Sequence, residues 1–283
     1  MIKQAIIPLA GLGTRLLPLT SVFPKELLPI NGKPSLEYII QECIDAGIKE
    51  IIFIISKKKM MIKNYFYNDN FYKNLIKRKK DLRIIAEYKK ILKYKKMIKF
   101  VYQNNPKGTG DAVLKTKKLI KDKYFLMLLP DDLIIKKNCS KSMIKTHKKY
   151  KASIMASMTV NKKNVSRWGI YKLNKKLNKN NYEIKGVVEK PSVKNAPSNK
   201  AVIGRYILPK SIFLKLKDTK PSKNGEIHIT DAIQSLIDDN EKFIAHNFFG
   251  KYLDCGTMNG YINSTKVISK LWSYVWLEQV MLV

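Results

Sequence analysis

The chain has 283 residues, of which 45% are hydrophobic and 10% aromatic, so a sizeable core can form and a disordered or collagen-like chain is excluded. The formal net charge of +33 raises nucleic acid or an anionic surface as a partner. However, only five of the 55 basic residues are arginines, and 50 lysines beside abundant Asn and Ile favour an AT-rich genome over a selected polyanion-binding surface.

The first part of the chain alternates apolar runs with a helical pattern. Residues 3–9 form an apolar run that ends at a glycine-rich turn, which predicts a buried first strand. Residues 34–46 have apolar positions at helical spacing, with a proline at the start and Gly47 after the end, which predicts a helix. The continuous apolar run 51–55 is typical of a parallel strand that is covered on both faces.

Two further apolar runs, 98–102 and 125–129, have the same character, and a helix is predicted between them at about 111–120. This β-α-β-α-β alternation predicts an α/β fold, a doubly wound sheet flanked by helices. Active sites in such sheets lie beyond the carboxyl ends of the strands. The loops of interest are therefore 10–26, 103–111 and 130–132.

Residues 57–97, between the second and third strands, are rich in Lys, Tyr, Phe and Asn and predict one or two inserted helices. A solvated helical insertion with inward-facing aromatic side chains is favoured over a basic-aromatic patch for single-stranded nucleic acid. After residue 150 the pattern predicts shorter strands and then a helix, at 153–159, 169–173, 184–188, 201–208 and 230–238. No clean linker separates the two halves, so we expect them to share one sheet.

Cysteine usage and targeting signals indicate a soluble cytoplasmic protein with no membrane partner. Cys43, Cys139 and Cys255 are far apart and odd in number, which predicts reduced thiols and no zinc site. Gly11 breaks the N-terminal apolar run too early for a signal peptide. The apolar segment 271–283 is too short to span a bilayer.

The strongest motif is AGLGTRLLPLTSVFPKE at residues 10–26. A glycine-bearing turn directly after a strand lets backbone N–H groups approach phosphate and base closely. Arg15 and Lys25 add two cations, which suits a triphosphate. The segment is not a Walker A loop, and Leu16 occupies the third glycine position of a Rossmann fingerprint. A nucleotide-binding loop of another kind is therefore favoured over an ordinary turn.

This segment, G-x-G-T-R followed by P-K, resembles the signature of the sugar-nucleotidyltransferase superfamily. Within it, the chain is most similar to the bacterial UTP–glucose-1-phosphate uridylyltransferases, also called UDP-glucose pyrophosphorylases, from residue 1 to about 265. Further motifs carry the resemblance at matching spacing: KGTGDAV at 107–113, LPDD at 129–132, WGIY at 168–171, VVEKP at 187–191, AVIGRYIL at 201–208, EIHITDAI at 226–233 and YLDCGTMNGY at 252–261.

The resemblance implies a single Rossmann-like nucleotidyltransferase domain over residues 1–265, with a mixed sheet of the nucleotide-diphospho-sugar transferase type. Residues 1–150 would form mainly the nucleotide-binding half, and residues 151–265 mainly the sugar-phosphate-binding half. It also implies that Arg15, Lys25 and Lys190 are catalytic. The nucleotide-binding residues would be Ala10, Gly11, Leu12, Gly13, Glu26, Gln103 and Gly108.

Asp131 and Asp132 follow an apolar strand and a proline, and paired carboxylates at that place suit Mg²⁺. The resemblance implies that Asp131 and, in the D-C-G loop, Asp254 are the metal ligands. The sugar phosphate would be bound by Asp132, Gly169, Glu189 and Lys190.

The implied reaction converts UTP and α-D-glucose 1-phosphate to UDP-glucose and pyrophosphate by in-line attack of the sugar phosphate on the α-phosphorus, assisted by Mg²⁺. The alternatives are a glucose-1-phosphate thymidylyltransferase, a catalytically silent regulatory paralogue and a polyanion-binding protein. The resemblance further implies a homo-oligomer without a specific nucleic-acid partner.

Some positions depart from the family pattern. Ser21 stands in place of a usual Lys, and Asp111 replaces the His of G-L-G-H-A, which adds negative charge near the nucleotide loop. Residues 266–283 are expected to form an atypical tail, of a kind that a frameshift would produce. In this tail the apolar residues are expected to be exposed: Trp272, Val275, Trp276 and Leu277.

Overall fold

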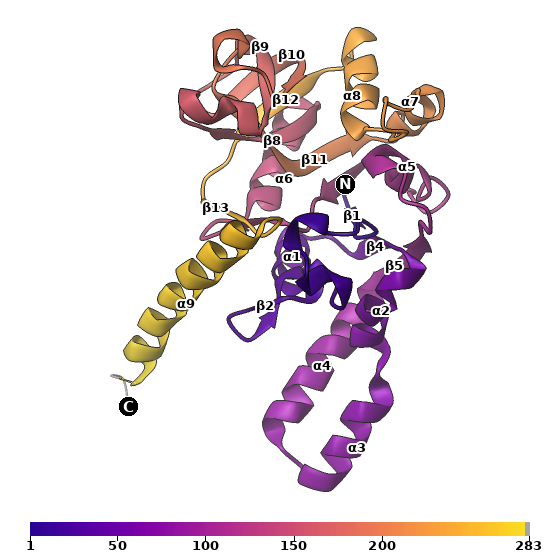
Figure 1. Cartoon of the computed structure of the whole chain (residues 1–283), viewed down its shortest axis with the longest axis vertical. Coiled ribbons are helices and arrows are strands. Elements are labelled where there is room, and N and C mark those ends of the chain that lie inside the picture. Colours follow the sequence, from indigo (N-terminus) through magenta and orange to yellow (C-terminus); the bar gives the residue numbers. More distant parts are fainter. Residues whose placement is uncertain (281–283) are drawn as a thin grey trace.

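A nine-stranded mixed sheet runs through the computed structural model, which describes residues 1–280 (Figure 1). Its strand order is β5-β4-β1-β6-β11-β8-β12-β10-β9. The strands are β1 (Gln4–Pro8), β4 (Glu50–Ile55), β5 (Ile98–Tyr102), β6 (Tyr124–Leu128), β8 (Ser153–Thr159), β9 (Gly169–Lys176), β10 (Asn181–Glu189), β11 (Lys200–Pro209) and β12 (Phe243–Asn247). This mixed sheet with its helices confirms the predicted fold class.

The first four strands along one side, β5, β4, β1 and β6, are parallel. In β4, Phe53 packs in one core cluster and Ile52 and Ile54 pack in another. Because alternate residues of a strand point to opposite faces, this strand is buried on both sides, which explains its continuous apolar run. Helices α1 (Ser35–Asp45) and α5 (Gly108–Leu114) belong to this half of the molecule.

The helix predicted at about 111–120 is shorter and begins earlier than predicted. Just after α5, both the backbone N–H and the hydroxyl of Thr116 donate to the carbonyl of Val113, at 2.9 and 2.7 Å. These bonds replace the helical bond to residue 112 with a tighter turn, because a threonine hydroxyl competes for nearby carbonyls. The helix therefore ends at Leu114.

Strands from the second half enter the same sheet. Strand β11 pairs antiparallel with both β6 and β8, and β12 pairs parallel with β8. The helices of this half are α6 (Cys139–Tyr150), α7 (Ile212–Asp218) and α8 (Ile229–Asp238). A separate ribbon pairs β7 (Asp132–Ile135) with β13 (Lys251–Asp254) and sets Asp132 opposite Asp254. A second small ribbon joins β2 (Pro29–Ile30) and β3 (Lys33–Pro34).

The insertion at 57–97 contains three α-helices rather than the one or two predicted: α2 (Met60–Tyr67), α3 (Asp69–Lys79) and α4 (Leu82–Met97). Lys80 adopts a left-handed conformation that ends α3, and the Asp81 carboxylate caps α4 by accepting from the Arg83 N–H at 2.8 Å. Tyr72 and Tyr88 stack between α3 and α4 with ring centroids 5.2 Å apart. Figure 1 shows this pair of helices extending away from the sheet.

The chain leaves the second half in a long helix, α9 (Met258–Val280), which also extends away from the sheet (Figure 1). The predicted atypical tail at 266–283 begins inside this helix. The side chains of Trp272, Val275, Trp276 and Leu277 lie outside the described part of the chain. Among the helices that the structure describes, none combines the length and the apolar character that crossing a membrane requires.

Candidate active site

Two adjoining cavities meet beyond the carboxyl end of β6, in the region where the fold predicts a site. The smaller, of about 330 Å³, is lined by loops that follow β1, β5 and β6, and we call it the nucleotide cavity. The larger, of about 540 Å³, is lined by β9, β10, β11 and the 252–257 loop, and we call it the sugar cavity. Arg15, Leu129 and Asp131 line both cavities, so they mark the junction.

The nucleotide cavity collects most of the residues predicted for nucleotide binding. They are Ala10, Gly11, Glu26, Gln103 and Gly108, together with Arg15 and Lys25. A Cβ added at Gly11 would meet no described atom within 4 Å, so this glycine leaves open space for a ligand at the backbone. Gly108 has φ +89°, and a Cβ there would lie 2.5 Å from the Ile227 carbonyl oxygen, so its conformation and its surroundings both require glycine.

Leu12 and Gly13, also predicted for nucleotide binding, are absent from the lining of the two cavities. The Leu12 side chain is 55% exposed. Gly13 has φ +73°, and its carbonyl accepts from the Thr20 hydroxyl at 2.8 Å, so it shapes the turn that carries Arg15. These two residues belong to the same loop as the cavity residues without facing the cavities.

At the junction, the Asp131 carboxylate accepts from Lys25 Nζ at 2.8 Å and from Arg15 Nη2 at 3.4 Å. Burial by itself would raise the pKa of Asp131, but the charge and hydrogen bond of Lys25, with help from Arg15, hold that pKa below its usual value. Conversely, burial by itself would lower the pKa of Lys25. The negative charges of Asp131 and Glu26 outweigh this effect of burial, so the pKa of Lys25 is raised. The junction therefore holds an ionised carboxylate between two cations.

Asp132 has a different environment from its neighbour. Its carboxylate accepts from the Gly204 N–H at 2.8 Å and from the Tyr252 hydroxyl at 2.7 Å. Burial, together with the negative charge of Asp131, raises the pKa of Asp132. The pKa values of two adjacent carboxylates thus shift in opposite directions. Through its two hydrogen bonds Asp132 also joins β11 to the β7–β13 ribbon, and it lines the sugar cavity.

The two predicted metal ligands are Asp131, which follows β6, and Asp254, the last residue of β13. The two segments are joined by a hydrogen bond from the Cys255 N–H to the Asp131 carbonyl at 2.7 Å. A Cβ at Gly256 would lie 2.7 Å from Asp131 Oδ2, so this glycine keeps space beside the carboxylate. Asp254 is oriented by the Gly256 N–H and the Thr257 hydroxyl, at 2.7 and 2.8 Å.

In the described part of the chain, no cluster of three acidic, His or Cys side chains forms a closed metal cage. One or two carboxylates that leave positions for substrate oxygens are the donor set that Mg²⁺ takes. Asp131 at the junction and Asp254 in the sugar cavity therefore fit this ion.

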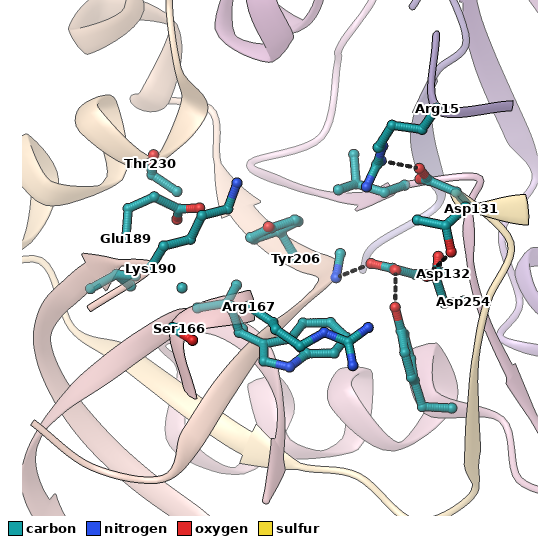
Figure 2. Close-up of a pocket in the computed structure, with 18 residues that line it drawn as sticks. Arg15, Asp131, Asp132, Ser166, Arg167, Glu189, Lys190, Tyr206, Thr230 and Asp254 are labelled. Carbon is teal, nitrogen blue, oxygen red and sulfur yellow. Dashed lines mark hydrogen bonds and ion pairs between the residues drawn. The ribbon is translucent and has the colours of Figure 1, made fainter. Parts of the chain in front are cut away.

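Across the sugar cavity, Figure 2 shows Glu189 and Lys190 facing the side that carries Arg15, Asp131, Asp132 and Asp254. A Cβ at Gly169 would lie 2.9 Å from Glu189 Oε2, so glycine is needed beside this carboxylate. The predicted sugar-phosphate residues Asp132, Gly169, Glu189 and Lys190 therefore all line one cavity.

Several lining residues were missed by the sequence analysis. They are Ser166, Arg167, Tyr206, Thr230, Tyr252 and Thr257 in the sugar cavity, and Thr109, Glu226 and His228 in the nucleotide cavity. Arg167, Tyr252 and His228 stand next to or within quoted motifs, so proximity to a motif was the available signal. Nothing in the residue types alone separates them from structural positions.

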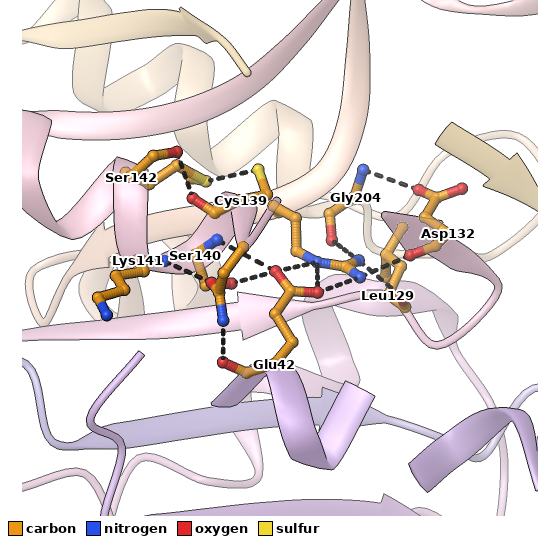
Figure 3. Close-up of polar contacts among 11 residues, drawn as sticks. Glu42, Leu129, Asp132, Cys139, Ser140, Lys141, Ser142 and Gly204 are labelled. Carbon is orange, nitrogen blue, oxygen red and sulfur yellow. Dashed lines mark hydrogen bonds and ion pairs between the residues drawn. The ribbon is translucent and has the colours of Figure 1, made fainter. Parts of the chain in front are cut away.

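A buried ion pair supports the loop that carries both aspartates. The Arg205 side chain is fully buried, and its Nη2 donates to Glu42 Oε2 at 2.9 Å and to the Asp132 carbonyl at 2.6 Å. Its Nη1 donates to the Leu129 carbonyl at 3.0 Å. Figure 3 shows Glu42, Leu129 and Asp132 converging on this network. The loop 129–132 is thereby fixed to α1 and β11.

Glu26, predicted near the nucleotide, is paired with Lys59 of the insertion. Lys59 Nζ donates to both carboxylate oxygens of Glu26 at 2.8 Å, and both side chains are buried. Burial lowers the pKa of Lys59, although Glu26 opposes the shift. Glu26 lines the nucleotide cavity while its carboxylate is held from the insertion side.

Comparisons with known proteins agree with this geometry. The family model described as Nucleotidyl transferase matches residues 4–270. The UTP–glucose-1-phosphate uridylyltransferase of Pseudomonas aeruginosa is 36% identical over 94% of this chain and 95% of its own. The enzyme of the same name from Bacillus subtilis is 36% identical over 93% and 90%.

A crystal structure of a UDP-glucose pyrophosphorylase complexed with UDP-glucose superposes with a TM-score of 0.83 at 38% identity, covering 95% of this chain and 99% of that one. A UTP-bound UGPase from Acinetobacter baumannii superposes with a TM-score of 0.87 at 34% identity, covering 95% and 93%. On the matched model, the relatives and the shared fold, the chain belongs to the nucleotidyl transferase family.

Proposed function

We propose that this chain transfers the uridylyl group of UTP to α-D-glucose 1-phosphate, giving UDP-glucose and pyrophosphate. The observation that carries the proposal is the pair of adjoining cavities that share Arg15 and Asp131. One cavity has a glycine-lined backbone suited to a nucleotide, and the other combines a carboxylate and an ammonium suited to a sugar phosphate. Relatives named UTP–glucose-1-phosphate uridylyltransferase share a third or more of their residues with the chain over nearly its full length.

The reaction is an in-line displacement at phosphorus. An oxygen of the sugar phosphate attacks the α-phosphorus of UTP from the side opposite the β-phosphate. The bond between the α-phosphorus and the bridging oxygen breaks, and pyrophosphate leaves with that electron pair. Such chemistry needs positioning and charge neutralisation more than covalent help from the protein.

We assign Arg15 and Lys25 to the triphosphate and Lys190 to the phosphate of the sugar. Arg15 lies at the wall that both cavities share, where the two phosphates would meet. Burial by itself would lower the pKa of Lys25. Because Asp131 and Glu26 raise that pKa instead, the amine stays charged. Glu189 would accept hydrogen bonds from sugar hydroxyls, and the absent side chain of Gly169 gives the sugar room.

We propose Mg²⁺ as the cofactor, held by Asp131 and Asp254. When bound, the ion supplies positive charge to the phosphate oxygens at the α-phosphorus. Lys25 and Arg15, which contact Asp131, hold that carboxylate ionised and oriented toward the junction.

A cytoplasmic location and a homo-oligomeric state are further proposals. Three buried free thiols, Cys43, Cys139 and Cys255, suit a reducing compartment. The oligomeric proposal rests on the family resemblance.

A pyrophosphate-release assay with glucose 1-phosphate, run with UTP and with dTTP and with and without Mg²⁺, tests the proposal. We expect turnover with UTP and Mg²⁺, and loss of turnover on chelation. Preference for dTTP would identify a thymidylyltransferase instead. Absence of turnover with both nucleotides would indicate the silent regulatory paralogue and overturn the enzymatic proposal.

A further inference from the structure

Gln103 has its amide nitrogen fully engaged on one side of the nucleotide cavity. The residue directly follows β5 and is 2% exposed, and its backbone N–H donates to the Ile55 carbonyl at 2.8 Å. Its Nε2 donates to Asp111 Oδ2 at 2.6 Å and to the Gly108 carbonyl at 3.2 Å. A side-chain amide has two N–H donors, so both are used within the protein.

The orientation of this amide follows from the chemistry of its partners. The nitrogen and oxygen of a glutamine are interchangeable in shape, so the hydrogen-bond network decides which is which. A carboxylate and a peptide carbonyl can only accept, so the atom that faces both Asp111 and Gly108 must be the nitrogen. The Gln103 oxygen is then the atom left for a ligand.

The partners of Gln103 are themselves fixed in place. Helix α5 begins at Gly108, and Ile227 clamps its first turn: the Ile227 N–H donates to the Lys107 carbonyl, and the Gly110 N–H donates to the Ile227 carbonyl, both at 2.8 Å. The Nζ of Lys115, the residue directly after α5, lies 3.5 Å from the other carboxylate oxygen of Asp111. The short bond of 2.6 Å therefore joins Asp111 to Gln103, and the contact with Lys115 is a longer one at the surface.

We propose that Asp111 is a specificity-determining residue, which locks Gln103 as a pure acceptor and so selects a pyrimidine that presents an N–H at ring position 3. Uracil and thymine carry that donor, whereas cytosine carries an acceptor there. With cytosine bound, the Gln103 oxygen would face the ring nitrogen at position 3, and both groups only accept. Each would then lack a hydrogen-bond partner, at a cost of about 1–3 kcal/mol for each buried group. This inference rests on the proposed function, because it assumes that the nucleotide cavity binds UTP.

The test is the selectivity of Asp111→Asn between nucleotides. Asparagine can donate as well as accept, so only the longer bond of 3.2 Å to the Gly108 carbonyl still holds the amide nitrogen, and Gln103 can turn and offer its N–H groups to cytosine. We expect the ratio of kcat/KM for UTP to that for CTP to fall about tenfold or more, the factor that corresponds to about 1.4 kcal/mol. The ratio of UTP to dTTP should stay unchanged, because both bases carry the same N–H, and so should the KM for glucose 1-phosphate.

Lys115→Gln is the matched control, since it removes a neighbouring charge and leaves the carboxylate in place, so its UTP to CTP ratio should equal that of the unaltered chain. A double-mutant cycle with Gln103→Leu adds an independent measurement, since Asp111→Asn should not change the ratio further once Gln103 is removed. If Asp111→Asn does not fold, Asp111→Ser carries the same expectation.

A UTP to CTP ratio that Asp111→Asn leaves within twofold would overturn this inference, and so would a parallel change in the UTP to dTTP ratio. Failure of the unaltered chain to use UTP would instead overturn the proposed function. The two failures are therefore distinguishable.

Discussion

Lys190 lies across the sugar cavity from Asp131, Asp132 and Asp254 (Figure 2). It has φ +45° and precedes Pro191, and its N–H donates to the Trp168 carbonyl at 3.0 Å. A non-glycine residue in this conformation costs about 1–3 kcal/mol, and such residues cluster at functional sites. This conformation occurs at Lys190 in the lining of the sugar cavity, and its place in that lining supports the assignment of Lys190 to the substrate.

We expect Lys190→Ala to lower kcat by at least about a hundredfold, because one electrostatic contact to the transition state is worth that much. Steady-state pyrophosphate release measures the change. Lys194→Ala is the control, since Lys194 is an exposed lysine four residues along the same loop and is absent from the lining of either cavity. Equal rates for the two variants would remove Lys190 from the machinery.

The motifs predicted most of the residues that gather at the cavities. They did not predict the partners of each residue or the direction in which its pKa shifts. Asp131 and Asp132 are adjacent and identical in type, yet one meets Lys25 and the other meets Tyr252. Lys25 holds the pKa of Asp131 down, whereas burial and the charge of Asp131 raise the pKa of Asp132 although the bond from Tyr252 opposes that rise. These partners lie more than a hundred residues away in the chain, and no local pattern indicates them.

At the level of whole elements, Arg205 of β11 joins α1 through Glu42 and the 129–132 loop through its carbonyls. We expect Arg205→Met to lower the free energy of unfolding by about 3–5 kcal/mol, because Glu42 would remain as a buried and unpaired charge. Urea denaturation followed by circular dichroism measures it.

The paired variant separates lost charge balance from lost packing. Arg205→Met combined with Glu42→Gln should regain most of the stability, because the uncompensated charge is gone. A double variant as unstable as Arg205→Met alone would contradict the electrostatic explanation.

Strand β12 (Phe243–Asn247) was not predicted, and the other eight strands of the sheet were predictable from their apolar runs. The β7–β13 ribbon was not, since its two four-residue strands pair across more than a hundred intervening residues. The break between α2 and α3 was also missed. Asn68 interrupts the helical pattern there without the glycine or proline that usually marks such a break.

Over the whole molecule, the net charge of +33 separates into a few placed cations and many that lie elsewhere. Arg15, Lys25 and Lys190 line the cavities, and Lys59 and Arg205 are buried in ion pairs. Exposed charges farther than about 10 Å from a ligand are largely screened at 0.1 M salt. The site therefore depends on a few cations whose positions the fold determines.

The stability of the whole molecule should depend on the protonation of His246 in β12. Its Nδ1 donates to Asn181 of β10 at 2.7 Å, and its Nε2 lies 3.0 Å from the Ser142 hydroxyl of α6. Burial lowers its pKa to about 4. In the unfolded chain a histidine has a pKa of about 6.5, so below that pH the unfolded state binds the proton more readily than the folded state.

The folded state therefore loses stability as the pH falls from about 6.5 toward 4. Between pH 7 and pH 5 this linkage amounts to about 2 kcal/mol. We expect His246→Gln to be less stable than the unaltered chain at pH 7, because it loses the fitted hydrogen bonds of the ring. Its further loss between pH 7 and pH 5 should be smaller by that same amount, since glutamine binds no proton. Urea denaturation of both proteins at the two pH values measures the difference, and equal losses would show that His246 titrates in the folded state as it does in the unfolded one.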